Sequence, residues 1–553
     1  MELRIQGRST WMWLLALIIF MSMVVSYVRI MTQRAQEITL PTPSGRGKIM
    51  ARDGTLLAMT RTENPGTFQQ KETRIYPLKT LAAQVVGIMG QTEGLEGLER
   101  AYDSDLKAGK NLRLTIDPKL QADTEQALSK HASENRAKHG GAIIMDISTG
   151  ELLAVASWPP LDPTDWRGKG PEILRNRPLI DRFEPGSVIK PLSVAAALDV
   201  GAITPDQTFD TPMVRRVGGR WASNIGDSVA HGPRLNIEDI LRYSSNVGMS
   251  HIVEKMTNEQ LLRSFQKLGF GRPVELGKAT TASGTLQPIN RWDNLVRTTN
   301  SFGQGMSVTL LQLAVSYAAL GNNGTYVTPR LTLPTENFNP EARPGETNTE
   351  SQTLANTSQT GEPKAPRLLA SLSSEQTTTE APNATATENA DNKPDVELKK
   401  TSEDSSGAED TETIDPDTAP AEGTQAFQKG STEEVRKMLR MVIELGIPHA
   451  AMIEGYELGG KTGTAQVVEN NRYSATTYES TFVGFYPAEK PEIVVAINAH
   501  GAEKNYQGSQ LAAPIYKEIV ASYISQNALP YSESLLEEQK DLQERRNKGE
   551  FMR

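Results

Sequence analysis

The stretch FEPGSVIKP, residues 183–191, places a serine directly behind a Pro-Gly turn and a lysine one helical turn further on. If a helix begins at Ser187, the side chain of Lys190 lies on the same face, and Gly186 allows the sharp entry. A serine hydroxyl is a poor nucleophile until a neighbouring base takes its proton, and lysine can be that base only when it is neutral. The stretch therefore predicts a nucleophile, Ser187, beside a general base, Lys190.

A neutral lysine at this position needs more than the helix start. The N-terminal end of a helix disfavours a cation by only about 0.3–1 kcal/mol, which is less than one pKa unit. Lowering the pKa of a lysine to about 7–8 requires burial or a second positive charge as well. We therefore expect another cation close to Lys190. The helix start also offers backbone N–H groups to a developing oxyanion.

The S-x-x-K spacing alone is not specific, because Ser104/Lys107 and Ser264/Lys267 repeat it in polar helical contexts. The ordered set is specific. YSSNVG (243–248) follows the first motif, and GGKTGTAQ (459–466) comes last. The order S-x-x-K, then S-x-N, then K-T-G matches the signature of penicillin-recognising enzymes.

With these motifs the chain resembles the class B penicillin-binding proteins, which are membrane-anchored D,D-transpeptidases that cross-link peptidoglycan. Further matching stretches are RGKIMARDGTLLA (46–58), GLEGLE (94–99), SFGQGMSVTLLQLAVSYAALGNNG (301–324) and NYQGSQLAAPIY (505–516). The Ser-Ser-Asn form of the second motif resembles the septal, cell-division branch. The resemblance implies an α+β fold, in which an antiparallel sheet carries helices on both faces and a helical lobe lies beside it.

The resemblance also implies a role for each motif residue. Ser187 would attack the D-Ala-D-Ala carbonyl and carry the acyl group, with Lys190 as its general base. Ser244 would relay a proton to the departing D-Ala. Asn246 would hold the donor peptide and orient Lys190.

The third motif would complete the site from an edge strand that faces the helix start. Lys461 would be the second cation. Thr462 and Thr464 would bind the terminal carboxylate, with Gly463 between them in the substrate-binding strand. The backbone N–H groups of Ser187 and Thr464 would form the oxyanion hole.

Partners and cofactors follow from the same resemblance. The substrates would be peptidoglycan stem peptides, as donor and as amine acceptor, and penicillins would acylate Ser187 irreversibly. The protein partners would be a SEDS-type glycosyltransferase and other divisome membrane proteins. The family uses no metal and no organic cofactor, and nucleic acid is not among the expected partners. The six histidines show no metal-ligand spacing.

The chain of 553 residues contains no cysteine, which excludes disulfides, a thiolate nucleophile and Cys-ligated zinc. No charge occurs between Arg8 and Arg29, and the run from Trp11 to Val28 is almost wholly apolar. We therefore predict a cytoplasmic tail over 1–10 and a single membrane-spanning helix over 11–30. The catalytic part would then lie outside the cytoplasm, anchored to the cell membrane.

Four further segments follow the predicted anchor. Residues 41–111 form a small β-rich pedestal, shorter than in larger relatives, and 112–530 form the transpeptidase domain. Within that domain, 336–425 is an acidic, disordered insertion, because it lacks the apolar residues of a core and carries 19 Asp or Glu against 6 Lys or Arg over 336–422. Residues 531–553 are a charged tail with a frayed helix.

Local patterns predict individual elements. The short stretches 45–58 and 94–100 suit strands and hairpins. Helices are expected over 117–134, with Pro118 at its start, over 191–201, and over 431–446, where Ser431 and Glu434 suggest a capping box. A hairpin is expected over 140–157, and neighbouring strands over 481–487 and 492–498.

Other functions share part of this pattern. A Ser-His-Asp hydrolase would need the G-x-S-x-G elbow, and Ser187 lacks the second glycine. A D,D-carboxypeptidase or β-lactamase would share all three motifs. An elongation-type transpeptidase and a divisome scaffold with an inert site also stay open.

Overall fold

The computed structural model describes residues 17, 20–25, 45–64, 70–219, 222–334, 420–447, 449–469, 472–548 and 550. Most of the predicted anchor and most of the predicted insertion lie outside these residues. Leu17 and residues 20–25, the part of the anchor that is described, are helical. Across the described residues, no helix combines the length and the apolar character that crossing a membrane requires.

The N-terminal region is a four-stranded sheet in the order β3-β2-β1-β4, in which β1 and β4 are parallel and the other pairs antiparallel. Its elements are β1 (Ile49–Met50), β2 (Leu56–Glu63), β3 (Lys71–Ile75), α2 (Ala83–Val86), α3 (Gly97–Ala101), α4 (Asp103–Lys107) and β4 (Leu112–Arg113). The hairpin predicted over 45–58 is confirmed.

The strand-like interpretation of 94–100 is wrong, because most of this stretch forms helix α3. The helix places the fully buried carboxylate of Glu99 between two arginines, Arg46 at 2.7 Å and Arg74 at 2.6 Å. This long-range ion cluster ties the helix to the sheet and overrides the local turn pattern, since a buried carboxylate is tolerated only when it is paired.

The larger region is built on an antiparallel sheet in the order β11-β12-β13-β5-β6. The strands are β5 (His139–Asp146), β6 (Leu152–Trp158), β11 (Gly459–Glu469), β12 (Arg472–Tyr486) and β13 (Ile493–His500). The predicted hairpin over 140–157 and the neighbouring strands in 481–498 are confirmed.

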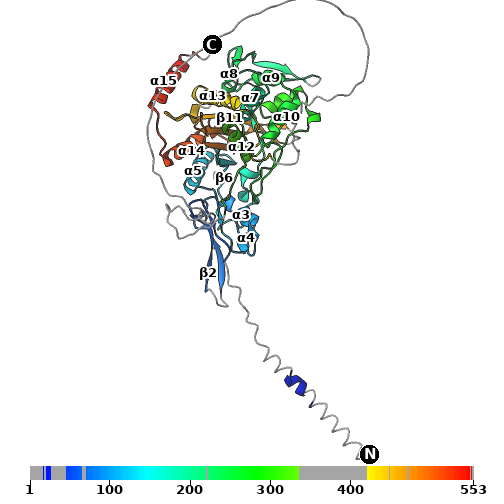
Figure 1. Cartoon of the computed structure of the whole chain (residues 1–553), viewed down its shortest axis with the longest axis vertical. Coiled ribbons are helices and arrows are strands. Elements are labelled where there is room, and N and C mark those ends of the chain that lie inside the picture. The colour runs from blue at the N-terminus through cyan, green and yellow to red at the C-terminus, as the bar shows by residue number, and fades with distance from the viewer. Residues whose placement is uncertain are drawn as a thin grey trace, which may run out of the picture. The chain divides into compact units, whose positions relative to one another are not determined.

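Alternation along these strands sends side chains to two separate cores. Ile144, Val495 and Ile497 face α5 (Pro118–Glu134) and α14 (Ala512–Gln526). Ile143 and Val494 face the opposite core, which contains α12 (Leu310–Gly321). Helices therefore cover both faces of the sheet, as predicted (Figure 1). Helix α5 spans the predicted residues, with Asp117 as its N-cap.

A helical lobe and two small two-stranded sheets complete the region. Its helices are α6 (Arg177–Ile180), α7 (Lys190–Asp199), α8 (Ile237–Arg242), α9 (Asn246–Glu254), α10 (Asn258–Lys267), α11 (Asn294–Ser301), α13 (Lys429–Leu445) and α15 (Glu533–Asn547), with 3₁₀ turns η1 (Pro171–Leu174), η2 (Gly186–Ile189), η3 (Ile289–Arg291) and η4 (His449–Ala451). One sheet pairs β7 (Thr208–Asp210) with β10 (Arg234–Asn236), and the other is the hairpin of β8 (Val214–Val217) and β9 (Ser223–Gly226).

Helix α13 begins two residues before the predicted capping box. Its N-cap is Gln428, whose backbone N–H donates to the Asp199 carboxylate at the end of α7 at 2.6 Å. The cap is therefore supplied by a residue far away in the sequence, and Ser431 lies inside the helix.

The described chain resumes at Pro420, inside the range predicted for the insertion. Gln425 forms a bridge with Thr325, and Phe427 is 1% exposed. The last residues of the predicted insertion therefore pack against the loop after α12.

The C-terminal charged segment forms a docked helix, contrary to the expected frayed end. Gln539 in α15 is 2% exposed, and its side chain bonds Gly455 and Tyr456. Glu538 adds an ion pair of 2.8 Å to Arg440 on α13. Polar side chains fix this helix, which explains why hydrophobic periodicity did not reveal the docking.

Candidate active site

The FEPG stretch delivers Ser187 to the start of a helix. Phe183 exchanges two backbone hydrogen bonds of 3.0 Å with Val308, and the Gly186 N–H donates to Gly303 O at 3.1 Å. Gly186 adopts φ +60, a conformation that glycine tolerates best. The half-buried Ser187 lies in the 3₁₀ turn η2, which leads directly into α7 at Lys190.

Two lysine amines from distant segments meet on one hydroxyl group. The Nζ of Lys190 donates to Ser244 Oγ at 3.1 Å and also to the Ser244 carbonyl. The Nζ of Lys461 donates to the same Ser244 Oγ at 3.1 Å. Lys190 is 0% exposed and Lys461 is 1% exposed. The structure thus places a second amine beside Lys190, in the position that the sequence argument required.

Burial is the main reason why the pKa values of both lysines are low. It holds the pKa of Lys190 well below the usual value, and the neighbouring Lys461 lowers it further, whereas Asp227 acts in the opposite direction. Burial lowers the pKa of Lys461 to about 7. Both shifts have the sign expected when charged groups lose their water. A neutral Lys190 is therefore accessible near neutral pH.

The K-T-G-T motif lies on β11, the edge strand of the sheet. Alternation puts Lys461 and Gly463 on one side of the strand and Thr462 and Thr464 on the other. A Cβ at Gly463 would lie 2.7 Å from Pro185 O, so only glycine lets this strand approach the η2 turn. Thr462 is 7% exposed, whereas Thr464 is exposed.

The Ser-Ser-Asn motif forms a strained turn between α8 and α9. Ser244 has φ 57, which is uncommon for a residue with a side chain. Ser245 is the N-cap of α9, and its Oγ accepts from the Gly248 N–H at 2.8 Å. The Asn246 side-chain amide donates to Gly226 O at 3.1 Å. Ser244, rather than Asn246, supplies the hydrogen bonds to Lys190 that the structure describes.

Asp227 holds this turn and was missed by the sequence analysis. Its buried carboxylate accepts from Ser245 Oγ at 2.5 Å and from the backbone N–H groups of Asn246 and Val247 at 2.5 and 3.1 Å. Three donors at the start of a helix make a strong carboxylate site. In the sequence, Asp227 stands alone in a loop, and no spacing rule connects it to the motif.

A family model described as the penicillin binding protein transpeptidase domain matches residues 140–360 and 391–521, which is more than half of the chain. The chain belongs to the penicillin-binding protein transpeptidase family. A second model, the penicillin binding protein A dimerisation domain, matches residues 46–127. The resemblance drawn from the three motifs is confirmed.

Curated relatives and a solved structure resemble this penicillin-binding protein over most of its length. The chain is 27% identical to the probable peptidoglycan D,D-transpeptidase PenA of Neisseria flavescens, over 78% of this chain and 86% of the relative. It is 27% identical to the peptidoglycan D,D-transpeptidase FtsI of Escherichia coli, over 83% and 68%. The crystal structure of penicillin binding protein 3 from Mycobacterium tuberculosis complexed with aztreonam has a TM-score of 0.69 and 25% identity, covering 90% of this chain and 99% of that one.

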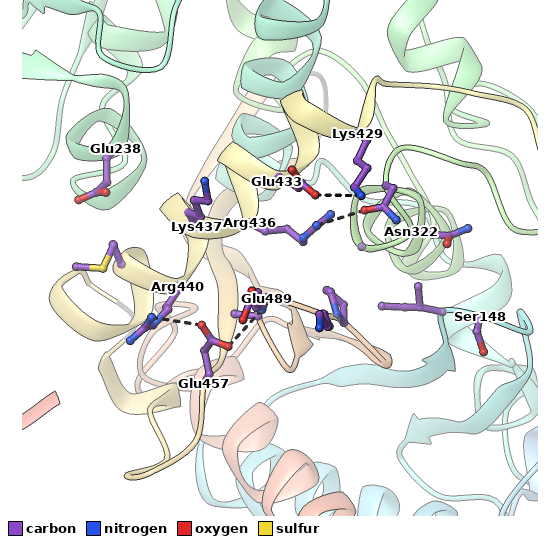
Figure 2. Close-up of a pocket in the computed structure, with 17 residues that line it drawn as sticks. Ser148, Glu238, Asn322, Lys429, Glu433, Arg436, Lys437, Arg440, Glu457 and Glu489 are labelled. Atoms are coloured by element: carbon purple, nitrogen blue, oxygen red, sulfur yellow. Dashed lines mark hydrogen bonds and ion pairs between the residues drawn. The ribbon is translucent and has the colours of Figure 1, made fainter. Parts of the chain in front are cut away.

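This penicillin-binding protein also has a pocket of about 720 Å³ away from the three motifs, beside α13 (Figure 2). Among the described residues that line it, none belongs to the predicted site. Several of its charges neutralise one another, as in the pairs Lys429–Glu433 at 3.6 Å and Arg440–Glu457 at 3.3 Å. We therefore place the chemistry at the lysine pair and not in this pocket.

Proposed function

We propose that the chain is a serine-type, class B peptidoglycan D,D-transpeptidase and that Ser187 is its nucleophile. The observation that carries the proposal is that Lys190, which follows Ser187 by one helical turn, and Lys461 both donate to Ser244 Oγ. A buried amine with a depressed pKa, next to a serine in a helix-start turn, is the arrangement that nucleophilic catalysis needs. The relatives named as D,D-transpeptidases supply the substrate class.

The proposed first half-reaction is acylation. Neutral Lys190 takes the proton from Ser187 Oγ, which attacks the carbonyl carbon of the penultimate D-Ala. The oxyanion is held by the backbone N–H groups of Ser187 and Thr464. The peptide C–N bond then breaks, and Ser244 passes a proton from the lysine pair to the departing D-Ala amine. Thr462, Gly463 and Thr464 hold the donor peptide along β11, beside Asn246.

The second half-reaction reverses these roles. The amine of a neighbouring stem peptide attacks the ester carbonyl, Lys190 takes the proton that the amine releases, and Ser187 recovers its own. In a β-lactam the broken C–N bond lies in a ring, so the amine stays attached and the acyl-enzyme persists.

We further propose a septal role, with the chain anchored in the cell membrane by 11–30 and its catalytic domain outside the cytoplasm. The Ser-Ser-Asn motif and the relative named FtsI support this role. A SEDS-type glycosyltransferase and other divisome membrane proteins are the proposed partners. An elongation role stays the second candidate, and a tagged copy in growing cells separates the two. Side-wall signal without enrichment at constrictions would count against the septal role.

The activity is tested by labelling with a fluorescent penicillin. We expect covalent labelling of the wild type, none of Ser187→Ala, and full labelling of Ser104→Ala, an exposed serine with the same S-x-x-K spacing. Equal labelling of wild type and Ser187→Ala would refute the nucleophile, and an unlabelled wild type would support an inert scaffold. Incubating a labelled stem peptide with a D-amino acid acceptor then separates transfer from hydrolysis: a transpeptidase gives the exchanged peptide as the main product.

A further inference from the structure

His231 lies between two oxygen acceptors behind the Ser-Ser-Asn turn. Its Nε2 is 2.8 Å from Asp227 Oδ2, and its Nδ1 is 2.7 Å from Gly232 O. The side chains of His231 and Asp227 are 0% and 1% exposed. Neither ring nitrogen therefore exchanges its protein partner for solvent in this arrangement.

This geometry indicates which nitrogens of the His231 ring carry a proton. A neutral imidazole has one N–H donor and one acceptor nitrogen, whereas an imidazolium has two donors. Gly232 O can only accept. Asp227 already receives three donors, from Ser245, Asn246 and Val247, which is the environment of an ionised carboxylate. Both nitrogens of His231 therefore face acceptors, and a ring protonated on both satisfies them.

The pair resolves a conflict within the site. Holding the Ser244 turn requires a carboxylate at Asp227, but a lone negative charge near Lys190 favours the ammonium form, which cannot act as a base. We propose that His231 and Asp227 form a buried ion pair that fixes the Ser244 turn while cancelling much of the negative charge beside Lys190. His231 is thus a positioning residue, since it acts through Asp227. The inference rests on the proposed function of Lys190.

Other charged groups around the ring are accounted for. Asp239 on α8 lies close enough for His231 to lower its pKa, although burial raises that pKa overall. Asp239 is itself paired with Arg242 at 2.6 Å. The ring of Tyr243 lies 5.9 Å from the imidazole, at a tilted angle. On the other side, Lys190 is faced by Lys461 and Asp227.

The test compares two charge changes with opposite signs, in the full-length protein in detergent. Asp227→Asn removes the negative charge and His231→Gln removes the positive one, while each keeps a side chain that can hydrogen-bond. We measure the second-order acylation rate constant for a fluorescent penicillin against pH, whose acid limb reports the base in the free enzyme. We expect the limb to move to lower pH in Asp227→Asn and to higher pH in His231→Gln, by roughly 0.5–1 unit each.

Two further variants serve as controls: the double variant Asp227→Asn/His231→Gln and a variant of a different histidine. The limb of the double variant is expected to return close to that of the wild type, and His251→Gln, at the far end of α9, is expected to leave it unmoved. A purely structural role would lower the rate at every pH without moving the limb. That outcome, or limbs that move in the same direction, would overturn the ion-pair inference. In either case a fluorescent penicillin would still label Ser187. Absence of that labelling in the wild type would instead contradict the proposed function.

A second measurement covers the case in which a variant fails to fold. Nitrogen NMR of wild-type protein labelled in its six histidines should show an imidazole with both nitrogens protonated. It is assigned to His231 by comparison with variants of His500 and His131, which lie 2.7 Å from Glu479 and 2.9 Å from Glu518. If every doubly protonated signal disappears with these two histidines, the inference is wrong.

Discussion

Replacing Lys461 with methionine should move the pH dependence of acylation. The Nζ atoms of Lys461 and Lys190 each lie 3.1 Å from the same oxygen, so they are at most about 6 Å apart. At that distance and an effective dielectric constant of about 20, a charged Lys461 opposes charging of Lys190 by about 3 kcal/mol, or about two pKa units. Methionine keeps the volume and removes the charge, so the pKa of Lys190 should rise.

The sign and size of the effect follow from the base that must be neutral. A higher pKa of Lys190 reduces the fraction of neutral Lys190 most strongly at low pH. The wild-type to variant ratio of acylation rate constants should therefore be about 10-fold to 100-fold larger at pH 6 than at pH 9. Because the pKa of Lys461 is about 7, the repulsion fades above neutral pH. Stopped-flow acylation by a fluorescent penicillin between pH 5 and 10 measures the ratio. Lys461→Arg, which keeps the charge, is the control. Parallel profiles for wild type and Lys461→Met would refute the electrostatic reasoning.

Three further predictions concern packing and stability. Gly463→Ala should slow acylation at least about 10-fold, because its Cβ would collide with Pro185 O, 2.7 Å away, and push β11 from the η2 turn; acylation kinetics measure this. Glu99→Gln should lower the free energy of unfolding by about 3–5 kcal/mol, since it leaves the buried Arg74 side chain without a carboxylate and leaves Arg46 with Asp103 alone, while the folded fraction still reacts with penicillin; thermal unfolding with residual labelling checks it. Lys461→Met should raise the free energy of unfolding by about 1–3 kcal/mol at pH 6 and by less at pH 9; thermal unfolding at both pH values tests it.

The last prediction depends on proton linkage. The folded-state pKa of Lys461 is lowered from 10.5 to about 7, so between these values the unfolded chain binds more protons than the folded chain. Wild-type stability therefore rises with pH across that window, and a methionine removes this rise.

Gly430→Ala, where a Cβ meets no atom within 4 Å, is the control for the Gly463→Ala prediction. An equal effect of the two alanines would contradict the steric account, and retention of wild-type stability by Glu99→Gln would contradict the ion-cluster account.

Sequence order predicted the parts of the site that come from contiguous motifs. Ser187 and Lys190 share a turn, so their proximity follows from helix geometry alone. The need for a second cation came from the small size of the helix-dipole effect, and Lys461 fills that position in the structure. Helix α5 was predicted to the residue because its N-cap and Pro118 are local signals.

The remaining features depend on contacts between distant segments. Asp227 reaches the Ser-Ser-Asn turn across a loop, and neither its type nor its spacing marks it in the sequence. The same is true of Asp199, which caps α13, and of the arginines that pair with the buried Glu99 in α3. In each case a polar group is satisfied by a partner that only the tertiary fold brings close.

The crystal structure of the full chain acylated by a penicillin tests the central claim most directly. The account predicts an ester on Ser187 Oγ, the acyl oxygen between the backbone N–H groups of Ser187 and Thr464, and the amine of Lys190 within hydrogen-bond reach of the ester oxygen. An adduct on any other residue, or a Lys190 amine turned away from Ser187 and paired with a carboxylate, would contradict it.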